Sequence, residues 1–284
     1  MRVLTEVQPT SSQIARELSE HNLSGWPSLR IVVVHYGDKA VLDGLFDSLE
    51  SQRHAGDVKL VVVNNGPEAL QGVPNKVGNF DLELIERLDN PGFGIASNQG
   101  AANAEEDVVL FLNPDTRLLD DGSLAELLEA FVSLGPNTMY SPLLTTEDRE
   151  VDPACARSLP TWSNVAHHYL GLGSPETTYN LKVDRQTGQH DVGALNGAFM
   201  MLESQVLAEL GGFNESYWMY GEDLDLCKRA QDLGVKCVLD TDLEVIHLKG
   251  ATSERSKSKS LRYAFIKSML IYANDHLRPR LGRG

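Results

Sequence analysis

The sequence predicts an α/β fold built around one mostly parallel central sheet. Apolar runs typical of strands alternate with segments of helical spacing along much of the chain. Several runs, such as residues 29–35 and 108–112, are almost continuously apolar, which is typical of strands buried on both faces. The 284 residues, 42% of them hydrophobic, suffice for one large domain or two small ones with a sizeable core.

The apolar spacing predicts the elements of the first half in chain order. Residues 29–35 and 58–64 are predicted to be buried strands, and residues 82–88 a more exposed strand. A helix is predicted over residues 39–52, where Val41, Leu42, Leu45, Phe46 and Leu49 recur at helical spacing. Residues 93–104 are predicted to form a helix of small residues, 108–112 a buried strand and 123–134 a further helix. Strands separated by helices favour parallel pairing.

The pattern becomes irregular after Gly135. Residues 145–189 are polar and rich in Pro, Gly and Thr, so we expect a variable surface segment there. Residues 197–202 are predicted to be a strand, followed by a helix that stops at Gly211-Gly212 and a helix that begins at Glu222. Residues 236–239 and 244–247 are predicted to close the core. Residues 1–28 are interpreted as an N-terminal extension.

The charge is unevenly distributed along the chain. The net charge of -15 argues against nucleic acid as a partner. Residues 251–284, however, hold eight Lys/Arg and two Asp/Glu, a balance of about +6. This basic, helical C-terminal tail has two interpretations: a helix packed on the domain with a solvated basic rim, or an interfacial helix in weak contact with anionic lipid.

The cysteines and the apolar runs bear on the compartment. Cys155, Cys227 and Cys237 are odd in number and have no Cys-x-x-Cys spacing, which favours a reducing compartment. The N-terminus has no signal pattern and no run reaches transmembrane length. We therefore expect a cytoplasmic protein, with peripheral contact at the inner membrane face if the tail binds lipid. The sequence does not define the oligomeric state.

Polar residues follow several predicted strands at the point where each ends. These ends are His35-Tyr36-Gly37-Asp38, Asn64-Asn65-Gly66, Asn113-Pro-Asp-Thr116 and His247. A single polar residue after a strand is usually a turn former. Four such ends at one edge of a parallel sheet indicate a ligand site, because ligands bind beyond the carboxyl ends of the strands.

Two of these residues are candidate metal ligands. Asp115 follows a buried strand, and Pro114 stiffens its approach. A carboxylate held there suits a hard divalent cation that carries a diphosphate, and His247 would add a nitrogen ligand. Mn²⁺ or Mg²⁺ is the expected cation, and Mn²⁺ accepts this mixture of ligands. Each residue taken alone is better explained by a structural role.

The stretch from Gly212 to Cys227 contains the candidate catalytic base. The spacing places Asp223 on the inward face of the predicted helix and Glu222 and Asp225 on the outward face. A carboxylate beside the aromatic residue Trp218 is well placed to accept a proton. The alternative is an acidic first turn that favours the helix dipole.

One motif invites a different interpretation. Gly92-Phe-Gly94 resembles part of a dinucleotide fingerprint, but the third glycine is missing and the preceding strand is not the first of the fold. A Gly-x-Gly pair alone is weak evidence. We therefore do not expect a nicotinamide or flavin cofactor.

Taken together, an ordered series of motifs resembles the family 2 inverting glycosyltransferases, and most closely their rhamnosyltransferase-like branch. It runs from about Leu29 to Gly250. The motifs are Val61-Val-Val-Asn-Asn-Gly66, Asn90-Pro-Gly-Phe-Gly-Ile-Ala-Ser-Asn98, Phe111-Leu-Asn-Pro-Asp-Thr116, Asn196-Gly-Ala-Phe-Met-Met201, Gly211-Gly-Phe-Asn214 and Gly221-Glu-Asp-Leu-Asp-Leu226. The resemblance implies a GT-A fold, with a Rossmann-like nucleotide-sugar half (residues 29–122) fused to an acceptor half (123–250).

The resemblance also implies roles for individual residues. Asp223 would be the general base, and Asp115 and His247 would hold the cation. The implied donor-binding set is Tyr36, Asn64, Gly94, Asn98, Asn113 and Asp115. The candidate acceptor-binding residues are Trp218 and Glu222, with Arg157 and Trp162 from the irregular segment 145–189. The reaction would be a single displacement that inverts the anomeric carbon.

Two departures from the family pattern affect the donor. Many relatives carry Asp where this chain has Asn64, but an amide oxygen still accepts the N3–H of uracil or thymine. Relatives often have Thr-Tyr-Asn where this chain has His35-Tyr36-Gly37. The expected donor is a UDP- or dTDP-sugar, with a deoxyhexose such as L-rhamnose favoured, and the acceptor is a glycan, a lipid-linked molecule or a small molecule.

Two other functions are weighed against this one. A sugar-1-phosphate nucleotidylyltransferase has a similar sheet, but it needs a Gly-rich phosphate loop with Arg and Lys after the first strand, where this chain has residues 35–38. A non-catalytic module that binds nucleotide sugars or carbohydrate would not need Asp115, Asp223 and His247 together. Both remain alternatives.

Overall fold

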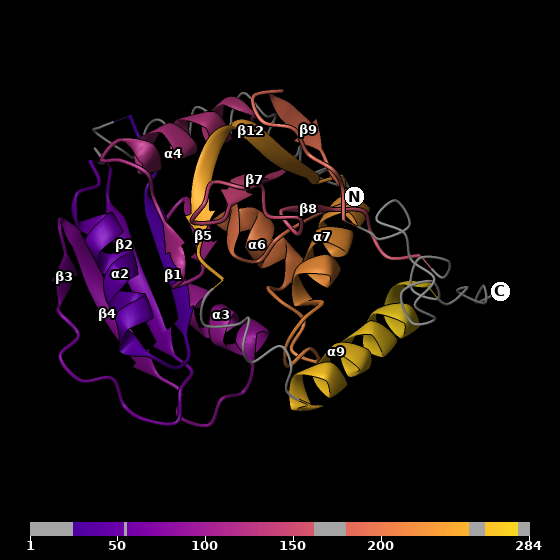
Figure 1. The fold of residues 1–284 in the computed structure, drawn as a ribbon, viewed down its shortest axis with the longest axis horizontal. Helices are drawn as coiled ribbons and strands as arrows, with labels where there is room; N and C mark the ends of the chain where they lie inside the picture. The colour runs from indigo at the N-terminus through magenta and orange to yellow at the C-terminus, as the bar shows by residue number, and fades with distance from the viewer. Residues whose placement is uncertain (1–24, 54–55, 162–179, 250–258, 278–284) are drawn as a thin grey trace, which may run out of the picture.

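A computed structural model describes residues 25–53, 56–161, 180–249 and 259–277 (Figure 1). The predicted α/β fold is confirmed: one ten-stranded mixed sheet runs through the molecule in the order β3-β4-β2-β1-β5-β11-β7-β12-β6, with β9 paired to β12. Within these ranges, no helix is long and apolar enough to cross a membrane. The predicted N-terminal extension lies outside the described residues, apart from positions 25–28.

The first half of the sheet is a parallel layer. Strand β1 (Leu29–His35) lies between β2 (Val58–Asn64) and β5 (Val108–Leu112), and β4 (Phe80–Glu86) pairs with β2; all these pairs are parallel. Strand β3 (Lys76–Val77) closes this edge in antiparallel pairing. The predicted bounds of β1, β2 and β5 are confirmed, because a continuous apolar run has a clear beginning and end.

Helices cover both faces of this parallel layer. Helix α3 (Phe93–Ala101) packs with Ala96 on Val34, Val61 and Val63. Helix α2 (Lys39–Glu50) contributes Leu42, Leu45, Phe46 and Leu49 to the main core cluster, which also contains Leu60 and Val62 of β2. Alternate residues of β2 thus face opposite layers, as the two-residue period of a strand requires.

The second half of the sheet is mixed. Strand β11 (Phe199–Glu203) runs antiparallel to both β5 and β7 (Thr138–Thr145), and β7 pairs in parallel with β12 (Lys236–His247). The short strands β6 (Thr116–Arg117) and β9 (Gln189–Asp191) pair with β12. Strands β8 (Ala156–Arg157) and β10 (Ala194–Leu195) form a separate two-stranded sheet.

Two features of this half differ from the sequence prediction. The two predicted strands at 236–239 and 244–247 are one strand, β12, with a bulge between Asp240 and Glu244. Strand β7 was not predicted, because Pro142 interrupts its apolar pattern and proline argues against a central strand. In the structure, Pro142 lies opposite Asp240, where the register shifts, so its missing N–H falls at the irregular point of the ladder.

The remaining helices lie beside the second half. Helix α4 (Ser123–Ser133) packs on β7, and α6 (Ser204–Leu210) ends at Gly211 in the left-handed conformation. Helix α7 (Glu222–Asp232) packs on β10 and β12. Helix α9 (Lys259–Tyr272) continues into a π-helical turn, η2 (Ala273–Leu277). Figure 1 shows α9 as a separate rod along the lower edge, beyond α7.

The prediction that Glu222 and Asp225 face outward on α7 is wrong. Both are buried, and Asp225 is only 1% exposed. The turn η2 covers Asp225: His276 Nε2 lies 2.7 Å from Asp225 Oδ1, and Arg229 Nε lies 2.7 Å from Oδ2. The helical spacing of α7 predicts only the face that packs on the sheet. The turn η2, near the C-terminus of the chain, covers a second face that contains Asp225.

The expectation of a surface segment over residues 145–189 is also wrong for residues 152–157. Thr145 ends β7, residues 147–150 are exposed, and the chain then returns to the core. Asp152, Cys155 and Ala156 are fully buried, and Arg157 is nearly so. The free cysteines Cys155, Cys227 and Cys237 are all buried. Residues 162–179, including Trp162, lie outside the described residues.

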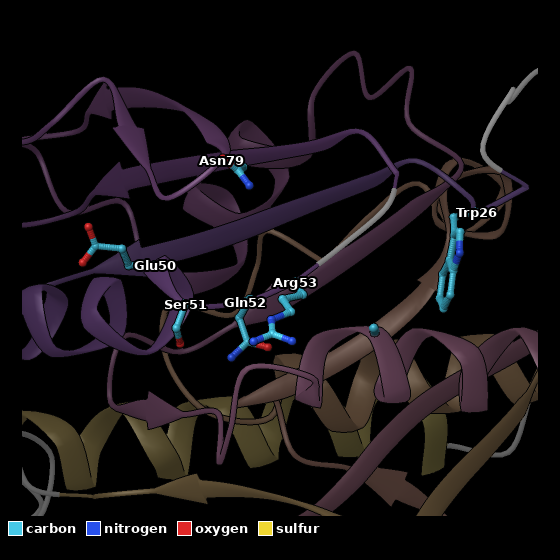
Figure 2. A pocket seen from close by; sticks show the side chains of 7 residues that line it. Trp26, Glu50, Ser51, Gln52, Arg53 and Asn79 are labelled. Atoms are coloured by element: carbon cyan, nitrogen blue, oxygen red, sulfur yellow. The ribbon is translucent and has the colours of Figure 1, made fainter.

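One open cavity of about 480 Å³ lies away from the predicted ligand edge (Figure 2). It is lined by Trp26, Glu50, Ser51, Gln52, Arg53, Asn79 and Ala125. Trp26 precedes β1 and residues 50–53 follow α2, so this cavity lies at the amino ends of the parallel strands. Ligands of such sheets bind at the carboxyl ends, and we place no function in this cavity.

Candidate active site

The Asn113–Thr116 turn follows β5 at the carboxyl edge of the sheet. Thr116 donates two hydrogen bonds to the carbonyl of Asn113, from its backbone N–H and from Oγ1 at 2.7 Å. Arg117 then fastens the turn to α2, because its guanidinium donates to the carbonyl oxygens of Pro114, Thr116 and Val41. This network holds the Asp115 carboxylate in a fixed, buried position.

Asp115 and His247 meet at the end of β12. His247 pairs with Thr116 in the β6–β12 register, and His247 Nε2 lies 3.5 Å from Asp115 Oδ1. On the other side of the ring, Nδ1 lies 3.1 Å from Asp152 Oδ2, and Lys249 Nζ donates to the other oxygen of Asp152 at 2.5 Å. The imidazole is therefore held between two carboxylates.

These contacts determine the electrostatics of the imidazole. Burial lowers the pKa of His247, but hydrogen bonds and charges from Asp115 and Asp152 outweigh it and raise the pKa to about 9. Burial likewise raises the pKa of Asp152, but hydrogen bonds from His247 and Lys249 outweigh it and hold the pKa at about 2. The site therefore favours positive charge between Asp115 and Asp152.

The donor set fits a divalent cation supplied with further ligands by a substrate. Asp115 offers carboxylate oxygen, and His247 offers Nε2 with its other nitrogen oriented by Asp152, as metal-ligating histidines usually are. Among the described residues, no group of three or more His, Cys, Asp or Glu side chains could hold a metal ion. The protein would thus provide two ligands, and diphosphate and water would complete the shell.

Asp223 lies in the first turn of α7, which begins at Glu222, directly after the left-handed residue Gly221. Its Oδ2 accepts a hydrogen bond from Gly197 N at 3.3 Å, and its Oδ1 accepts one from Leu224 N at 2.8 Å. Arg157 Nη2 lies 2.5 Å from Oδ2 and also donates to the carbonyl of Leu195. This ion pair, with both side chains about one-tenth exposed, fixes the orientation of the carboxylate.

Two adjacent residues just before β11 join Asp223 to the Asn113 turn. The carbonyl of Ala198 accepts a hydrogen bond from Asn113 N at 2.9 Å, while the N–H of the preceding Gly197 donates to Asp223. A candidate base and a candidate metal-binding turn from distant parts of the chain therefore converge on one short segment. Such convergence at the edge of the sheet is what a reaction site requires.

Glu222 lies beside Asp223 and is buried as well. Its Oε2 has no hydrogen-bond partner among the described residues. Burial and the neighbouring charge of Asp223 raise the pKa of Glu222 to about 8. The raised pKa favours the neutral form of Glu222, which would donate a hydrogen bond to a molecule that enters the site.

The loop before α7 packs tightly on the start of α3. Trp218, 36% exposed, donates from Nε1 to the carbonyl of Asn90, and its own carbonyl accepts from Phe93 N. Gly92 has a φ of 109°, and a Cβ there would lie 2.4 Å from the Trp218 carbonyl oxygen. A Cβ on Gly94 would lie 3.3 Å from Cβ of Phe213, which is a tight contact. Both glycines of the apparent dinucleotide motif thus serve close packing.

Asn98 connects α3 to the turn after α6. Its Oδ1 accepts from Phe213 N at 2.7 Å, and its Nδ2 donates to the Phe213 carbonyl at 2.9 Å. Gly212, with a φ of 73°, leaves the space for Asn98, since a Cβ there would lie 2.4 Å from Oδ1. The structure thus gives Asn98 a structural contact, and its predicted contact with the donor stays a prediction.

Tyr36 and Asn64 lie at the carboxyl ends of β1 and β2. Tyr36 is 42% exposed and is accessible to a ligand. Asn64 is buried; its Nδ2 donates to Glu86 Oε2 at 2.5 Å and to the Glu68 carbonyl, and its Oδ1 accepts from Gly66 N at 3.1 Å. A nucleobase contact would therefore use the remaining acceptor capacity of Oδ1.

Sequence reasoning missed Asp152 and assigned Arg157 to the acceptor. Asp152 is 95 residues from its partner His247, and Arg157 is 66 residues from its partner Asp223. Neither lies in a periodic element whose spacing would indicate burial. The proximity of Asp152 to Pro153 was the only local feature, and it indicates a turn rather than a site.

The carboxyl edge of the mixed sheet thus gathers a buried carboxylate, an imidazole and a helix-borne aspartate into one candidate active site. Residues 30–170 match the model of glycosyl transferase family 2. The chain therefore contains a glycosyltransferase family 2 domain and is an enzyme of the glycosyltransferase class.

Curated relatives cover most of the chain. This chain is 29% identical over 269 residues to the N-acetylglucosaminyl-diphospho-decaprenol L-rhamnosyltransferase of Mycobacterium tuberculosis (strain ATCC 25618 / H37Rv). The matched region spans 87% of this chain and 84% of that relative. It is 26% identical over 194 residues to the rhamnosyltransferase WbbL of Escherichia coli (strain K12), covering 64% of this chain and 69% of that one.

Solved structures share the fold. GalNAc-T7 with UDP, GalNAc and Mn²⁺ superposes on 79% of this chain and 43% of its own, with a TM-score of 0.58 and 16% identity. TarS of S. aureus superposes on 90% of this chain and 40% of its own, with a TM-score of 0.53 and 14% identity. This chain spans less than half of either structure, and the likeness concerns the GT-A fold alone.

Proposed function

We propose that the enzyme is a metal-dependent, inverting glycosyltransferase that moves a deoxyhexose such as L-rhamnose from a UDP- or dTDP-sugar to a hydroxyl of a lipid-linked acceptor. The observation that carries the proposal is the convergence of Asp223 and the Asn113–Asp115 turn on Gly197-Ala198. The donor sugar and the acceptor class are taken from the names of the rhamnosyltransferase relatives, one of which acts on a diphospho-decaprenol substrate.

The residues of the chain have distinct tasks in this reaction. Asp223, oriented by Arg157, accepts the proton of the attacking hydroxyl at Oδ1 or Oδ2. One carboxylate of this kind suffices for a single displacement at the anomeric carbon. A single displacement inverts the anomeric configuration. Glu222, with its raised pKa, stays neutral and donates a hydrogen bond to the sugar or the acceptor.

A cation would be held by Asp115 and His247, with Asp152 orienting the imidazole. When bound, Mn²⁺ or Mg²⁺ would neutralise charge on the departing diphosphate. Asn113 lies within the same turn and would contact ribose or phosphate, and the exposed Tyr36 would frame the nucleobase. The Mn²⁺ in the GalNAc-T7 structure supports a divalent cation in this fold.

A donor screen tests the proposal. The purified protein is incubated with UDP-, dTDP- and GDP-sugars and Mn²⁺, with undecaprenyl- or decaprenyl-diphospho-N-acetylglucosamine and with soluble glycans as acceptors. We expect release of nucleoside diphosphate and sugar transfer with dTDP-L-rhamnose and the lipid-linked acceptor. Turnover of a purine-diphospho sugar alone would contradict the donor assignment, and full activity in EDTA would contradict the metal.

A further inference from the structure

Helix α9 exposes an apolar stripe to solvent. Tyr263 is 70% exposed, Ile266 42% and Leu270 64%. Their spacing of three and four residues places them on one side of the helix. The opposite side is buried against the domain through Ala264, Ser268, Met269 and Tyr272. The helix is therefore held in place by one side while the other presents large apolar groups to the surroundings.

Positive charge accompanies this stripe. Arg262 and Lys267 are exposed, and the helical spacing places them on either side of the apolar stripe. The helix from Lys259 to Tyr272 contains no Asp or Glu. The first 250 residues carry 17 basic and 38 acidic side chains, so the stripe is a local cationic surface on an acidic protein. An apolar stripe bordered by cations matches the boundary of an anionic lipid layer.

The buried side of α9 rests on the loop that leads to the candidate base. Ser268 Oγ donates to the Met219 carbonyl at 2.9 Å, and the rings of Phe265 and Tyr220 lie 6.1 Å apart. A Cβ on Gly221 would lie 3.1 Å from Met269 Cε. Gly221 immediately precedes Glu222 and Asp223. A surface bound by α9 would therefore lie close to the N-terminal end of α7.

We propose that α9 docks the enzyme on an anionic lipid bilayer. Tyr263, Ile266 and Leu270 enter the apolar boundary, while Arg262 and Lys267 pair with lipid phosphates. At about 21 Å the helix is too short to span the hydrocarbon core, so it lies in the plane of the surface. The suggestion that docking brings Asp223 to a lipid-linked diphosphate rests on the proposed function, whereas the docking itself does not.

Charge favours a bilayer over a second copy of the chain as the occupant of this face. A symmetric pair of α9 helices would place Arg262 and Lys267 of one copy against the same residues of the other. Like charges brought together in this way destabilise the contact. An anionic bilayer instead supplies the opposite charge to both residues at once.

Co-sedimentation of the full chain with lipid vesicles tests the proposal. The vesicles consist of phosphatidylcholine alone or mixed with phosphatidylglycerol, and neither donor nor acceptor is added. We expect binding to the mixed vesicles that weakens at high salt, and little binding to phosphatidylcholine. Because each basic residue near an anionic surface adds about 1 kcal/mol, R262E/K267E should weaken binding by roughly thirty-fold or more.

Matched variants separate the stripe from general effects of charge and hydrophobicity. I266N/L270N should lose binding, whereas Leu233→Asn, at a leucine of 58% exposure after α7, should not. K182E/K236E changes the net charge by as much as R262E/K267E, at exposed lysines outside α9, and should bind nearly as the parent does. Circular dichroism and melting temperature confirm that each variant is folded.

Several outcomes would overturn the proposal. Equal loss of binding in both charge pairs would show non-specific attraction, and unchanged binding in I266N/L270N would remove the stripe from the contact. A concentration-dependent dimer in light scattering that I266N/L270N abolishes would assign the face to a second copy. Because no sugar transfer is measured, failure of docking leaves the glycosyltransferase proposal intact, and the donor screen can fail while docking holds.

Discussion

Arg157 and Asp223 form a buried ion pair across 66 residues of sequence, with Nη2 2.5 Å from Oδ2. The same guanidinium donates to the carbonyl of Leu195, so it is anchored on the protein side and presents a fixed partner to the carboxylate. Residues 152–157 therefore contact both parts of the site. Arg157 pairs with the candidate base Asp223, and Asp152 contacts the candidate metal ligand His247. Local changes in this segment will therefore reach the candidate base and the candidate metal ligands together.

The first prediction concerns this pair. We expect Asp223→Asn to lower kcat by ~10²–10⁴-fold, as loss of a general base does, with donor binding nearly unchanged. Arg157→Met should lower kcat with little change in the KM for the acceptor, because Arg157 acts through Asp223. It should also lower the free energy of unfolding by about 3–5 kcal/mol, the usual cost of leaving one buried charge unpaired.

Arg53→Met is the matched control for stability. Arg53 pairs with Asp121 at the surface, and its side chain is 83% exposed, so its removal should cost less than about 1 kcal/mol. If Arg157→Met raises the acceptor KM and leaves kcat unchanged, Arg157 contacts the acceptor, as expected for a residue of the irregular segment 145–189. A larger loss of kcat in Glu222→Gln than in Asp223→Asn would reverse the roles of the two acids.

The second prediction concerns the residue that orients His247. Asp152→Asn should weaken Mn²⁺ binding by ~10–100-fold, because partners that hold a metal-ligating imidazole typically contribute that much. Asp115→Ala and His247→Ala should weaken it further. Mn²⁺ binding is followed by electron paramagnetic resonance of the free ion in the presence of UDP or dTDP, which does not require turnover. Asp191→Asn, at an exposed residue of β9, is the control, and equal loss there would exclude a specific role for Asp152.

The third prediction concerns pH. Burial and the charge of Asp223 raise the pKa of Glu222 to about 8, above its ordinary value of 4.5. The folded protein therefore holds this proton more tightly than the unfolded chain. The resulting stabilisation is complete below about pH 4.5 and is lost as the pH rises through about 8.

Urea unfolding of the parent and Glu222→Gln measures this dependence. Relative to the parent, Glu222→Gln should gain stability progressively between pH 6 and 9, since glutamine cannot ionise. Glu129→Gln, at an exposed position of α4, should follow the parent throughout. A constant difference between Glu222→Gln and the parent over this range would show that Glu222 is already ionised at neutral pH.

The fourth prediction compares two adjacent glycines. Gly211 and Gly212 have φ values of 70° and 73°, but a Cβ on Gly211 meets nothing within 4 Å, whereas one on Gly212 lies 2.4 Å from Asn98 Oδ1. Gly211→Ala should therefore cost ~1–2 kcal/mol from backbone strain alone. Gly212→Ala should cost more, because it also displaces the Asn98 side chain. Equal melting temperatures for the two variants would mean that Asn98 moves away without loss.

Sequence reasoning predicted the parts of the fold that depend on local pattern. The strands 29–35, 58–64 and 108–112 have the predicted bounds because their apolar runs are continuous. It also predicted that Asp115 and His247 lie at one edge of the sheet, since Asp115 follows a strand and His247 ends one. It failed where contacts come from distant parts of the chain: His276 of η2 contacts Asp225, Asp223 pairs with Arg157, and His247 contacts Asp152. No spacing within those segments encodes such contacts.

The antiparallel direction of β11 changes where ligand-facing residues are found in a chain of this kind. In a purely parallel sheet, residues that precede a strand lie at the edge opposite the ligand. Since β11 runs against β5, Gly197 and Ala198 precede their strand and yet lie beside the end of β5. In related sequences of unknown function, the residues just upstream of this reversed strand therefore merit mutational scanning alongside those that follow the forward strands.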